Sequence, residues 1–237
     1  MMRTIALVIA NECASSFDAL TGGRRAAIAI GGRRLYQYIA DELKSFFGTV
    51  LVASPEPAEG YSWLEVRECS LEDALMRAAE LASPSDRVFV ADGSIIVGGD
   101  AARSLVETAA MAGADGGVLA VPSRARGLAI SVRSEGLLAG VGGEGQLIYG
   151  GLALLPARAL KLLAAGLPFP SALSELAAST KIAVAVWSGE WYRIEDPVDI
   201  LGALEHVMPD ATYISPKAKV SPTAVLEGPV RVEAGAE

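Results

Sequence analysis

The sequence predicts an α/β protein with a Rossmann-like, mostly parallel sheet sandwiched between helices. Apolar runs rich in β-branched residues alternate with stretches of helical spacing over residues 1–208. The runs are apolar at consecutive positions, as in strands that are covered on both faces. The chain has 237 residues, of which 51% are hydrophobic, so it can bury a large core.

Each expected strand is a short apolar run bounded by turn residues. The first four runs lie at 4–10, 49–53, 87–91 and 117–121. Gly-rich or polar turns separate the next three, which predicts an antiparallel excursion over 127–132, 137–141 and 146–155. The last strand is expected at 182–187.

Helices are expected between these strands. Residues 35–47 carry apolar side chains at helical spacing. Ser70 is an expected N-cap with Asp73 three residues later, which predicts a helix to about residue 81. Pro197 suits a first helical turn and Asp196 the N-cap before it. The remaining helices are expected at 101–112, 157–165, 171–179 and 197–207.

Composition excludes several classes of function. The net charge of −8 argues against a nucleic-acid partner. No run approaches eighteen apolar residues, so we expect no membrane partner. The single histidine, His206, argues against mechanisms built on His triads or multi-His metal sites. The two cysteines, Cys13 and Cys69, provide no disulfide framework, so we expect an unpaired Cys13 and a cytoplasmic location.

Residues 209–237 differ in character from the rest. From residue 214 they divide into the hexads ISPKAK, VSPTAV, LEGPVR and VEAGAE. Each hexad begins with an aliphatic residue and has a small or aliphatic residue at its fifth position. This period predicts the first coil of a left-handed hexapeptide β-helix, with a Pro-rich linker as the alternative. Because a coil takes three hexads, we expect residue 237 to be a boundary inside a longer solenoid.

The loop after the first strand is a candidate phosphate-binding site. Ligands of parallel sheets bind beyond the carboxyl ends of the strands, where this loop lies. It has flexible glycines, and four arginines follow within a short stretch, as suits a polyphosphate. The alternative is a solvated, Arg-rich surface. The arginines are Arg24, Arg25, Arg33 and Arg34.

Carboxylates at two places are candidate Mg²⁺ ligands. Asp92 ends a buried strand and is followed by Gly93, where phosphoryl and nucleotidyl transfer need a metal-binding carboxylate. The alternative is a turn-forming Asp-Gly pair. Glu195 and Asp196 precede the last helix, and Asp196 is a metal candidate as well as a cap.

Several segments in order resemble the sugar-phosphate nucleotidyltransferases. They are ALVIANECASSFDALTGGRRAAIAIGGRRLYQYI, VFVADGSIIV, GADGGVLAVPSR, QLIYGGLALLPARAL and SGEWYRIEDPVDILGAL. The resemblance puts Arg25 at the family's phosphate-contacting lysine and implies catalytic roles for Asp92 and Arg25. It implies nucleotide binding by Ala10, Asn11, Glu12, Arg25, Asp92 and Gly93. It also implies sugar-phosphate binding by Gly150 and Gly151, and Mg²⁺ held by Asp92 and Asp196.

The sequence departs from the family at its signature positions. The Gly-rich loop G-x-G-[TS]-R is replaced by residues 12–16, ECASS, with Glu12 where a triphosphate would lie. The slot of the metal aspartate holds Ser94, two residues after Asp92, and the slot of the second holds Arg193. The family's Glu-Lys pair is absent near 140–145.

Three functions therefore stay open. The first is nucleotidyl transfer, in which a nucleoside triphosphate and a sugar 1-phosphate give a nucleoside-diphosphate sugar and pyrophosphate. The second is a non-catalytic regulatory or scaffolding homologue, and the third a cytidylyl- or molybdopterin-type transferase. The expected assembly is a trimer formed through the β-helix, or a hetero-oligomer with an intact paralogue.

Overall fold

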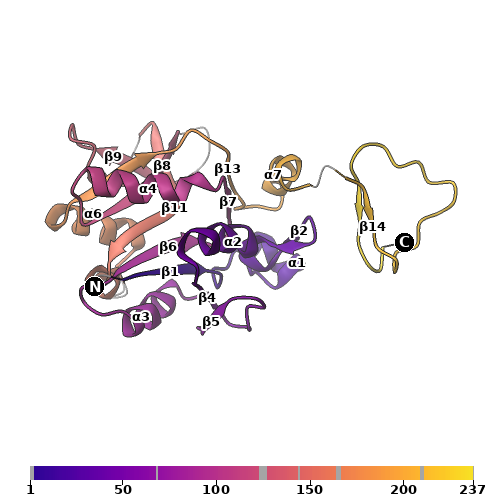
Figure 1. The fold of residues 1–237 in the computed structure, drawn as a ribbon, viewed down its shortest axis with the longest axis horizontal. Coiled ribbons are helices and arrows are strands. Elements are labelled where there is room, and N and C mark those ends of the chain that lie inside the picture. The colour runs from indigo at the N-terminus through magenta and orange to yellow at the C-terminus, as the bar shows by residue number, and fades with distance from the viewer. Residues whose placement is uncertain are drawn as a thin grey trace.

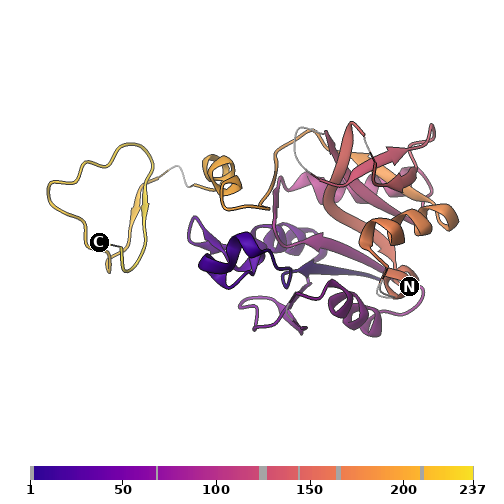
Figure 2. The ribbon, with the colours of Figure 1, turned by 180° about the vertical axis from the view of Figure 1, so that it is seen from behind.

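The computed structural model of the chain describes residues 3–67, 69–122, 127–143, 145–163, 167–208 and 211–236. A body of helices and strands carries an open coil at one end, and helix α7 (Asp199–Val207) lies between the two (Figure 1). The same arrangement seen from behind places the coil and the N-terminal end of the chain on opposite sides (Figure 2). None of the described helices combines the length and apolar character needed to cross a membrane.

One central sheet organises the body. In the described residues it has nine strands, and its main path runs β10-β9-β11-β6-β1-β4-β5, with β8 between β11 and β12. The parallel pairs are β1 with β4 and β6, β4 with β5, and β8 with β12, whereas β11 is antiparallel to β6, β8 and β9. The predicted α/β class with a largely parallel sheet and an antiparallel excursion is thus confirmed. The strands are β1 (Thr4–Ile9), β4 (Val50–Ser54), β5 (Ser62–Glu65), β6 (Arg87–Asp92), β8 (Gly116–Pro122), β9 (Ala129–Val132), β10 (Leu138–Val141), β11 (Leu147–Pro156) and β12 (Ile182–Val186).

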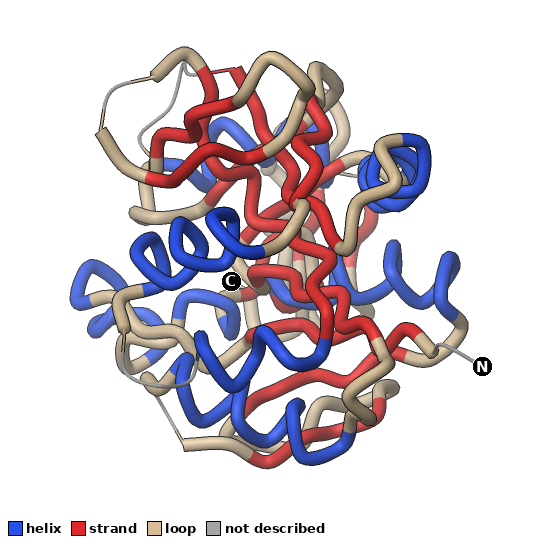
Figure 3. Tube along the Cα trace, turned by 90° about the vertical axis from the view of Figure 1, so that its left-hand side faces the viewer, coloured by secondary structure: helices blue, strands red, loops and turns tan. Residues whose placement is uncertain are grey.

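Helices cover both faces of this sheet, so the strands run through the middle of the molecule (Figure 3). The first face is packed by α2 (Leu35–Phe47) and α4 (Asp100–Met111), and the second by α3 (Leu71–Leu81), α5 (Ala157–Leu163) and α6 (Phe169–Ser179). The expected helix over 35–47 is confirmed. The expected cap of α3 is confirmed as well, because Oγ of Ser70 accepts the backbone N–H of Asp73 at 3.2 Å.

Alternation along the strands divides the core into two layers. In β1, Leu7 points toward the α3 side and Val8 toward the α2 side, and in β6 Val90 and Phe89 divide in the same way. All four side chains are buried. The apolar runs in the sequence are therefore continuous because each strand needs apolar side chains on both faces.

Short elements at one end of the sheet have their own small core. They are η1 (Ser15–Phe17), α1 (Asp18–Thr21), η2 (Arg25–Ala27), β2 (Ala29–Ile30), β3 (Arg33–Arg34), β7 (Ile95–Val97) and β13 (Trp191–Arg193). Phe17, Leu35, Ile96 and Ile194 are buried together there. The predicted N-cap role of Asp196 for the last helix is wrong. The N-cap position of α7 is Val198. The Asp199 carboxylate accepts the backbone N–H groups of Glu195 and Asp196, so the segment before the helix forms a turn around this side chain.

The C-terminal segment returns to its starting point after eighteen residues. Strands β14 (Tyr213–Ile214) and β15 (Arg231–Val232) pair in parallel, with Tyr213 opposite Arg231. The backbone N–H of Lys219 donates to the carbonyl of Ala236, which repeats the spacing of the bond from Tyr213 to Val230 in this strand pair. The offset of eighteen residues between Tyr213 and Arg231 equals three of the predicted hexads, while the assignment to a hexapeptide β-helix stays a prediction. Residues 209, 210 and 237 lie outside the described residues.

Candidate functional site

A pocket of about 330 Å³ opens where strands β1 and β6 end. The two strands are parallel neighbours, and Ile9 at the end of β1 lies opposite Asp92 at the end of β6. Their carboxyl ends therefore deliver the loop after each strand to the same edge of the sheet, as parallel sheets do at ligand sites. The charged side chains in the wall of the pocket are Glu12, Arg25, Asp92, Arg193 and Glu195.

Glu12 and Arg25 form one ion pair of this wall. Glu12 lies in the loop after β1, and Arg25 begins the short helix η2. An Nη2–Oε2 distance of 2.5 Å joins the guanidinium to the carboxylate. The cation expected to contact a phosphate is thus already bound by a carboxylate of the chain itself.

Asp92 is held by the turn that follows it. Oδ1 of Asp92 accepts the backbone N–H of Ser94 at 2.8 Å and its hydroxyl at 2.5 Å. Gly93 lies against β1, because a Cβ atom there would be 2.4 Å from the carbonyl oxygen of Ile9. The Asp-Gly turn considered from the sequence is present. With Oδ1 engaged by Ser94, the other carboxylate oxygen of Asp92, Oδ2, faces Arg193.

Arg193 joins the two remaining carboxylates of the wall. Its guanidinium lies 3.6 Å from Asp92 and 3.7 Å from Glu195, and its side chain is only 9% exposed. The rings of Tyr149 and Trp191 flank the guanidinium, with their centroids 5.9 and 5.8 Å from its central carbon. Strand β13 fixes this position, because it pairs with β7 and sets Arg193 opposite Ile95.

Gly150 and Gly151 contact the side chains of Trp191 and Arg193, respectively. They lie in β11 where its register with β8 shifts, and Gly151 has φ +86°. A Cβ atom on Gly151 would be 3.2 Å from a guanidinium nitrogen of Arg193. The carbonyl of Gly150 accepts the indole N–H of Trp191 at 2.9 Å. Neither glycine lines the pocket, so their predicted role in sugar-phosphate binding stays a prediction.

Burial and crowding of charge change how this wall titrates. Burial, together with the nearby Asp92, raises the pKa of Glu12 from 4.5 to about 7, although Arg25 opposes the shift. Burial lowers the pKa of Arg25, but the carboxylates of Asp92 and Glu12 outweigh it, and the net pKa of Arg25 is raised. Burial also raises the pKa of the Tyr149 phenol well above its usual value. Arg25 therefore stays cationic, while Glu12 titrates near neutral pH.

The other described lining residues are mostly apolar. Tyr149 and Phe169 contact each other with ring centroids 5.5 Å apart. The aliphatic side chains come from β1, α3, β6 and the segment before β9: Ile9, Leu71, Val90 and Leu128. The pocket therefore combines one charged wall with one apolar wall.

The structure gathers some predicted site residues and separates others. Glu12, Arg25 and Asp92 meet in the pocket. Ala10 and Asn11 are buried beneath it, and the Asn11 amide donates to the carbonyls of Arg67 and Ser70. Ala10, Asn11, Gly93 and Asp196 are not part of the lining, which has Glu195 in place of Asp196.

The other arginines of the predicted phosphate site point elsewhere. Glu56 is 2.7 Å from Arg24 and 3.9 Å from Arg34, and Arg33 pairs with Asp41. Sequence reasoning also missed Tyr149 and Phe169 as pocket residues. Tyr149 in β11 and Phe169 at the start of α6 come together only in the folded chain, so no local signal in the sequence identifies them.

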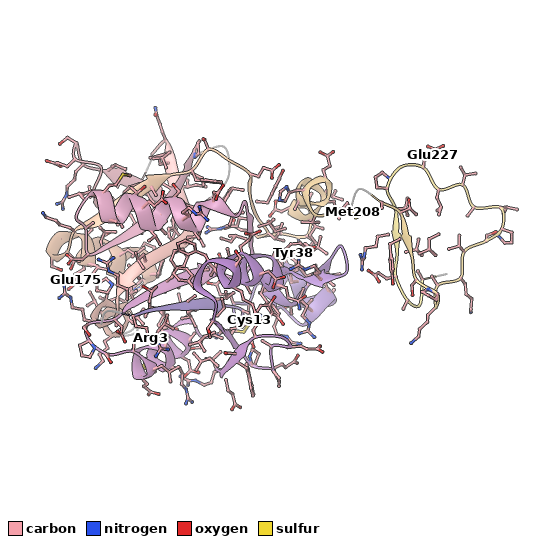
Figure 4. All side chains as sticks on the ribbon, in the orientation of Figure 1. Arg3, Cys13, Tyr38, Glu175, Met208 and Glu227 are labelled. Carbon is pink, nitrogen blue, oxygen red and sulfur yellow. A yellow bond between two sulfur atoms is a disulfide. The ribbon has the colours of Figure 1, made fainter. Side chains whose placement is uncertain are left out.

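The expectation of an unpaired Cys13 is wrong. Cys13 and Cys69 form a disulfide, although 56 positions separate them in the chain. The loop after β1 and the loop before α3 meet at the sheet edge, where the N–H of Cys69 also donates to the carbonyl of Asn11 at 2.8 Å. Figure 4 labels Cys13 within the outline of the body, away from the C-terminal coil. The bond fixes the loop that carries Glu12 beside the segment that carries Leu71.

The donor set does not fit Mg²⁺. A hard cation needs several unengaged oxygen ligands, but Asp92 is engaged by Ser94 on one oxygen and faces Arg193 with the other. Arg193 also faces Glu195. In the part of the chain that the structure describes, no three His, Cys, Asp or Glu side chains gather as metal ligands. The guanidinium occupies the place between the carboxylates that a cation would take.

Comparison with solved structures decides the fold. A putative glucose-1-phosphate thymidylyltransferase from Bacillus anthracis, solved with a sucrose, superposes with a TM-score of 0.73 at 13% identity, over 86% of this chain and 95% of the other. UTP-bound UGPase from Acinetobacter baumannii gives 0.67 at 12% identity, over 88% and 94%. The inositol-1-phosphate CTP transferase from T. maritima gives 0.65 at 14% identity, over 87% and 96%.

The chain shares its fold with these three nucleotidyltransferase structures. The likeness covers most of every chain compared. No protein-family model matches the sequence, and no curated protein matches it either. Identities of 12–14% show a shared fold and do not show a shared function. The residues of the pocket are therefore the evidence for the function of this chain.

Proposed function

We propose that the chain is a non-catalytic homologue on the sugar-phosphate nucleotidyltransferase fold, which binds a ligand but does not perform metal-dependent nucleotidyl transfer. The observation that carries the proposal is the guanidinium of Arg193 between Asp92 and Glu195. In-line transfer between phosphates depends on positioned cations that neutralise the charge of the transferred group. Here the cation is part of the chain, and its charge is already balanced.

The loop after β1 supports the same conclusion. A triphosphate-binding loop presents backbone N–H groups and uncompensated cations to its ligand. This loop instead directs the Glu12 carboxylate to Arg25 and is closed by the disulfide of Cys13. In the described residues the pocket therefore differs from a metal–triphosphate site at both Asp92 and Arg25.

Metal binding tests the proposal directly. We expect titration of the protein with Mn²⁺, followed by electron paramagnetic resonance, to show no site tighter than about millimolar. Arg193→Asp places a third carboxylate beside Asp92 and Glu195, and we expect this variant to bind Mn²⁺ in the micromolar range. Arg103→Asp makes the same charge change on the exposed surface of α4, where the side chain is 60% exposed, and should bind no better than the parent protein.

Turnover supplies the second readout. We expect no pyrophosphate from the parent protein with Mg²⁺, any of the common nucleoside triphosphates and a panel of sugar 1-phosphates. Micromolar Mn²⁺ binding by the parent protein, or pyrophosphate release that stops in Arg193→Met, would refute the proposal.

A further inference from the structure

Among the described residues that line the pocket, each guanidinium group has a carboxylate partner. Both guanidinium groups in its wall are bound by carboxylates of the same wall, Arg25 by Glu12 and Arg193 by Asp92 and Glu195. The described part of the wall has three carboxyl groups and two guanidinium groups, so its net charge is negative when Glu12 is ionised and zero when Glu12 is protonated. An anion entering this pocket meets no net attraction.

A phosphate group would also disturb these pairs. At Arg25 it would compete with Glu12 for Nη2, and at Arg193 it would lie beside the carboxylates of Asp92 and Glu195 or displace them. Each displaced carboxylate would stay in the wall without its partner and next to the incoming negative charge. Because part-buried charges interact more strongly than charges in water, both effects work against the phosphorylated ligand.

The opposite wall favours an uncharged ring. Phe169 and Tyr149 present aromatic surface, and Ile9, Val90 and Leu128 add aliphatic surface. A volume of about 330 Å³ is at the small end for ligand pockets and holds a single sugar ring or a nucleoside. The ion pairs on the charged wall still have hydrogen-bonding capacity for hydroxyl groups, since carboxylates and guanidinium groups each make several hydrogen bonds.

We propose that this pocket binds an uncharged sugar-ring compound, a nucleoside or a glycoside, and rejects the phosphorylated form of the same compound. The proposal rests on the proposed function, because a metal-dependent transferase would need the phosphorylated ligand. Selection against phosphate is an example of specificity achieved by repulsion of the wrong ligand.

Matched pairs of ligands test this selection on the intact protein. Calorimetric titrations would compare uridine with UTP, thymidine with TTP, and methyl glucoside with glucose 1-phosphate, each with EDTA and with Mg²⁺. We expect one uncharged compound to bind, its phosphorylated partner to bind at least tenfold more weakly, and Mg²⁺ to make no difference. Whether a nucleoside or the glycoside binds identifies the source of the sugar ring.

Two variants assign the binding to this pocket. Leu128→Arg puts a long cationic side chain at a part-exposed position of the wall and should abolish binding of the uncharged compound. Glu12→Gln removes one negative charge with little change of shape, so the phosphorylated partner should gain about tenfold in affinity relative to the uncharged compound. Glu107→Gln, an exposed position on α4, makes the same charge change away from the pocket and should alter neither affinity.

The outcomes separate this proposal from the proposed function. Tighter binding of a phosphorylated compound without turnover would overturn phosphate rejection and leave the non-catalytic assignment intact. Failure of every uncharged compound to bind at millimolar concentration, or unchanged binding in Leu128→Arg, would overturn the ligand class. Pyrophosphate release would overturn the proposed function itself.

Discussion

Gly151 and Arg193 fit against each other so closely that a Cβ atom on Gly151 would lie 3.2 Å from Nη2 of Arg193. The φ angle of Gly151 is +86°, in a region that L-residues with side chains rarely adopt. Glycine at this position therefore allows the positive φ of β11 and leaves room for the buried guanidinium of Arg193.

Gly151→Ala should lower the free energy of unfolding by about 2–4 kcal/mol, since it adds backbone strain to a steric conflict with Arg193 and Ile95. Gly113→Ala is the matched control. Gly113 also has a positive φ, +54°, but no atom lies within 4 Å of the Cβ position, so only the backbone cost of about 1 kcal/mol remains. Urea unfolding of both variants measures the difference, and equal losses would contradict the packing role of Gly151.

Breaking the pair of Arg193 and Asp92 should be costly on either side. Arg193→Met leaves two part-buried carboxylates uncompensated and should lower the free energy of unfolding by about 3 kcal/mol. Asp92→Asn should lower the free energy of unfolding less in the Arg193→Met variant than in the parent protein. The difference, which is the coupling energy of the pair, should be at least about 1 kcal/mol.

The exposed pair of Asp100 and Arg103 provides the control for that cycle. Its side chains are 82% and 60% exposed, so the double-mutant cycle of Asp100→Asn and Arg103→Met should give a coupling energy near zero. Equal couplings for the two pairs would mean that Arg193 is not held as the structure places it.

Glu12 should make stability depend on pH in a predictable direction. Its pKa is about 7 in the folded chain against an ordinary value of 4.5, so the folded state binds more protons between these values. Stability from this group is therefore present below pH 4.5 and is lost as the pH rises through 7, by on the order of 1–3 kcal/mol. Glu12→Gln should remove this loss.

Chemical denaturation at pH 5, 6, 7 and 8 measures the effect as the difference between the parent protein and Glu12→Gln. The difference isolates Glu12 from other groups that titrate in the same range. A difference that does not change with pH would show that Glu12 is ionised normally in the folded chain.

The disulfide should stabilise the fold. Cys13→Ser with Cys69→Ser should lower the free energy of unfolding by about 2–4 kcal/mol, because the bond closes a long loop and restricts the unfolded chain. Dithiothreitol should destabilise the parent protein by a similar amount and leave the double variant unchanged. If the parent protein retains two titratable thiols after purification without reductant, the bond is absent in solution.

The sequence predicts the large elements well because their signals are local. Helix α2 is recognised from the spacing of its apolar residues, and α3 from the Ser70 cap. Strands β7 and β13 are not predicted, since three residues carry no measurable period and the two strands form by pairing with each other.

The site is less predictable because it forms from distant segments. The β1 end, the β6 end and β13 meet only after folding, so the sequence could place Glu12, Arg25 and Asp92 at one edge but not the guanidinium between Asp92 and Glu195. Glu195 lines the pocket and its neighbour Asp196 does not, and the sequence alone does not distinguish between these adjacent carboxylates. The disulfide was missed for the same reason, since nothing local brings Cys13 and Cys69 together.

The bond between Cys13 and Cys69 also encloses α2, β4 and β5 in one covalent ring. Inside this ring the turn between β4 and β5 is accessible, with Pro57, Glu59 and Gly60 exposed. A protease that cleaves this turn would open the ring without releasing either piece. The nicked protein would therefore migrate as a single species on a non-reducing gel and as two fragments of unequal length once the sulfurs are separated.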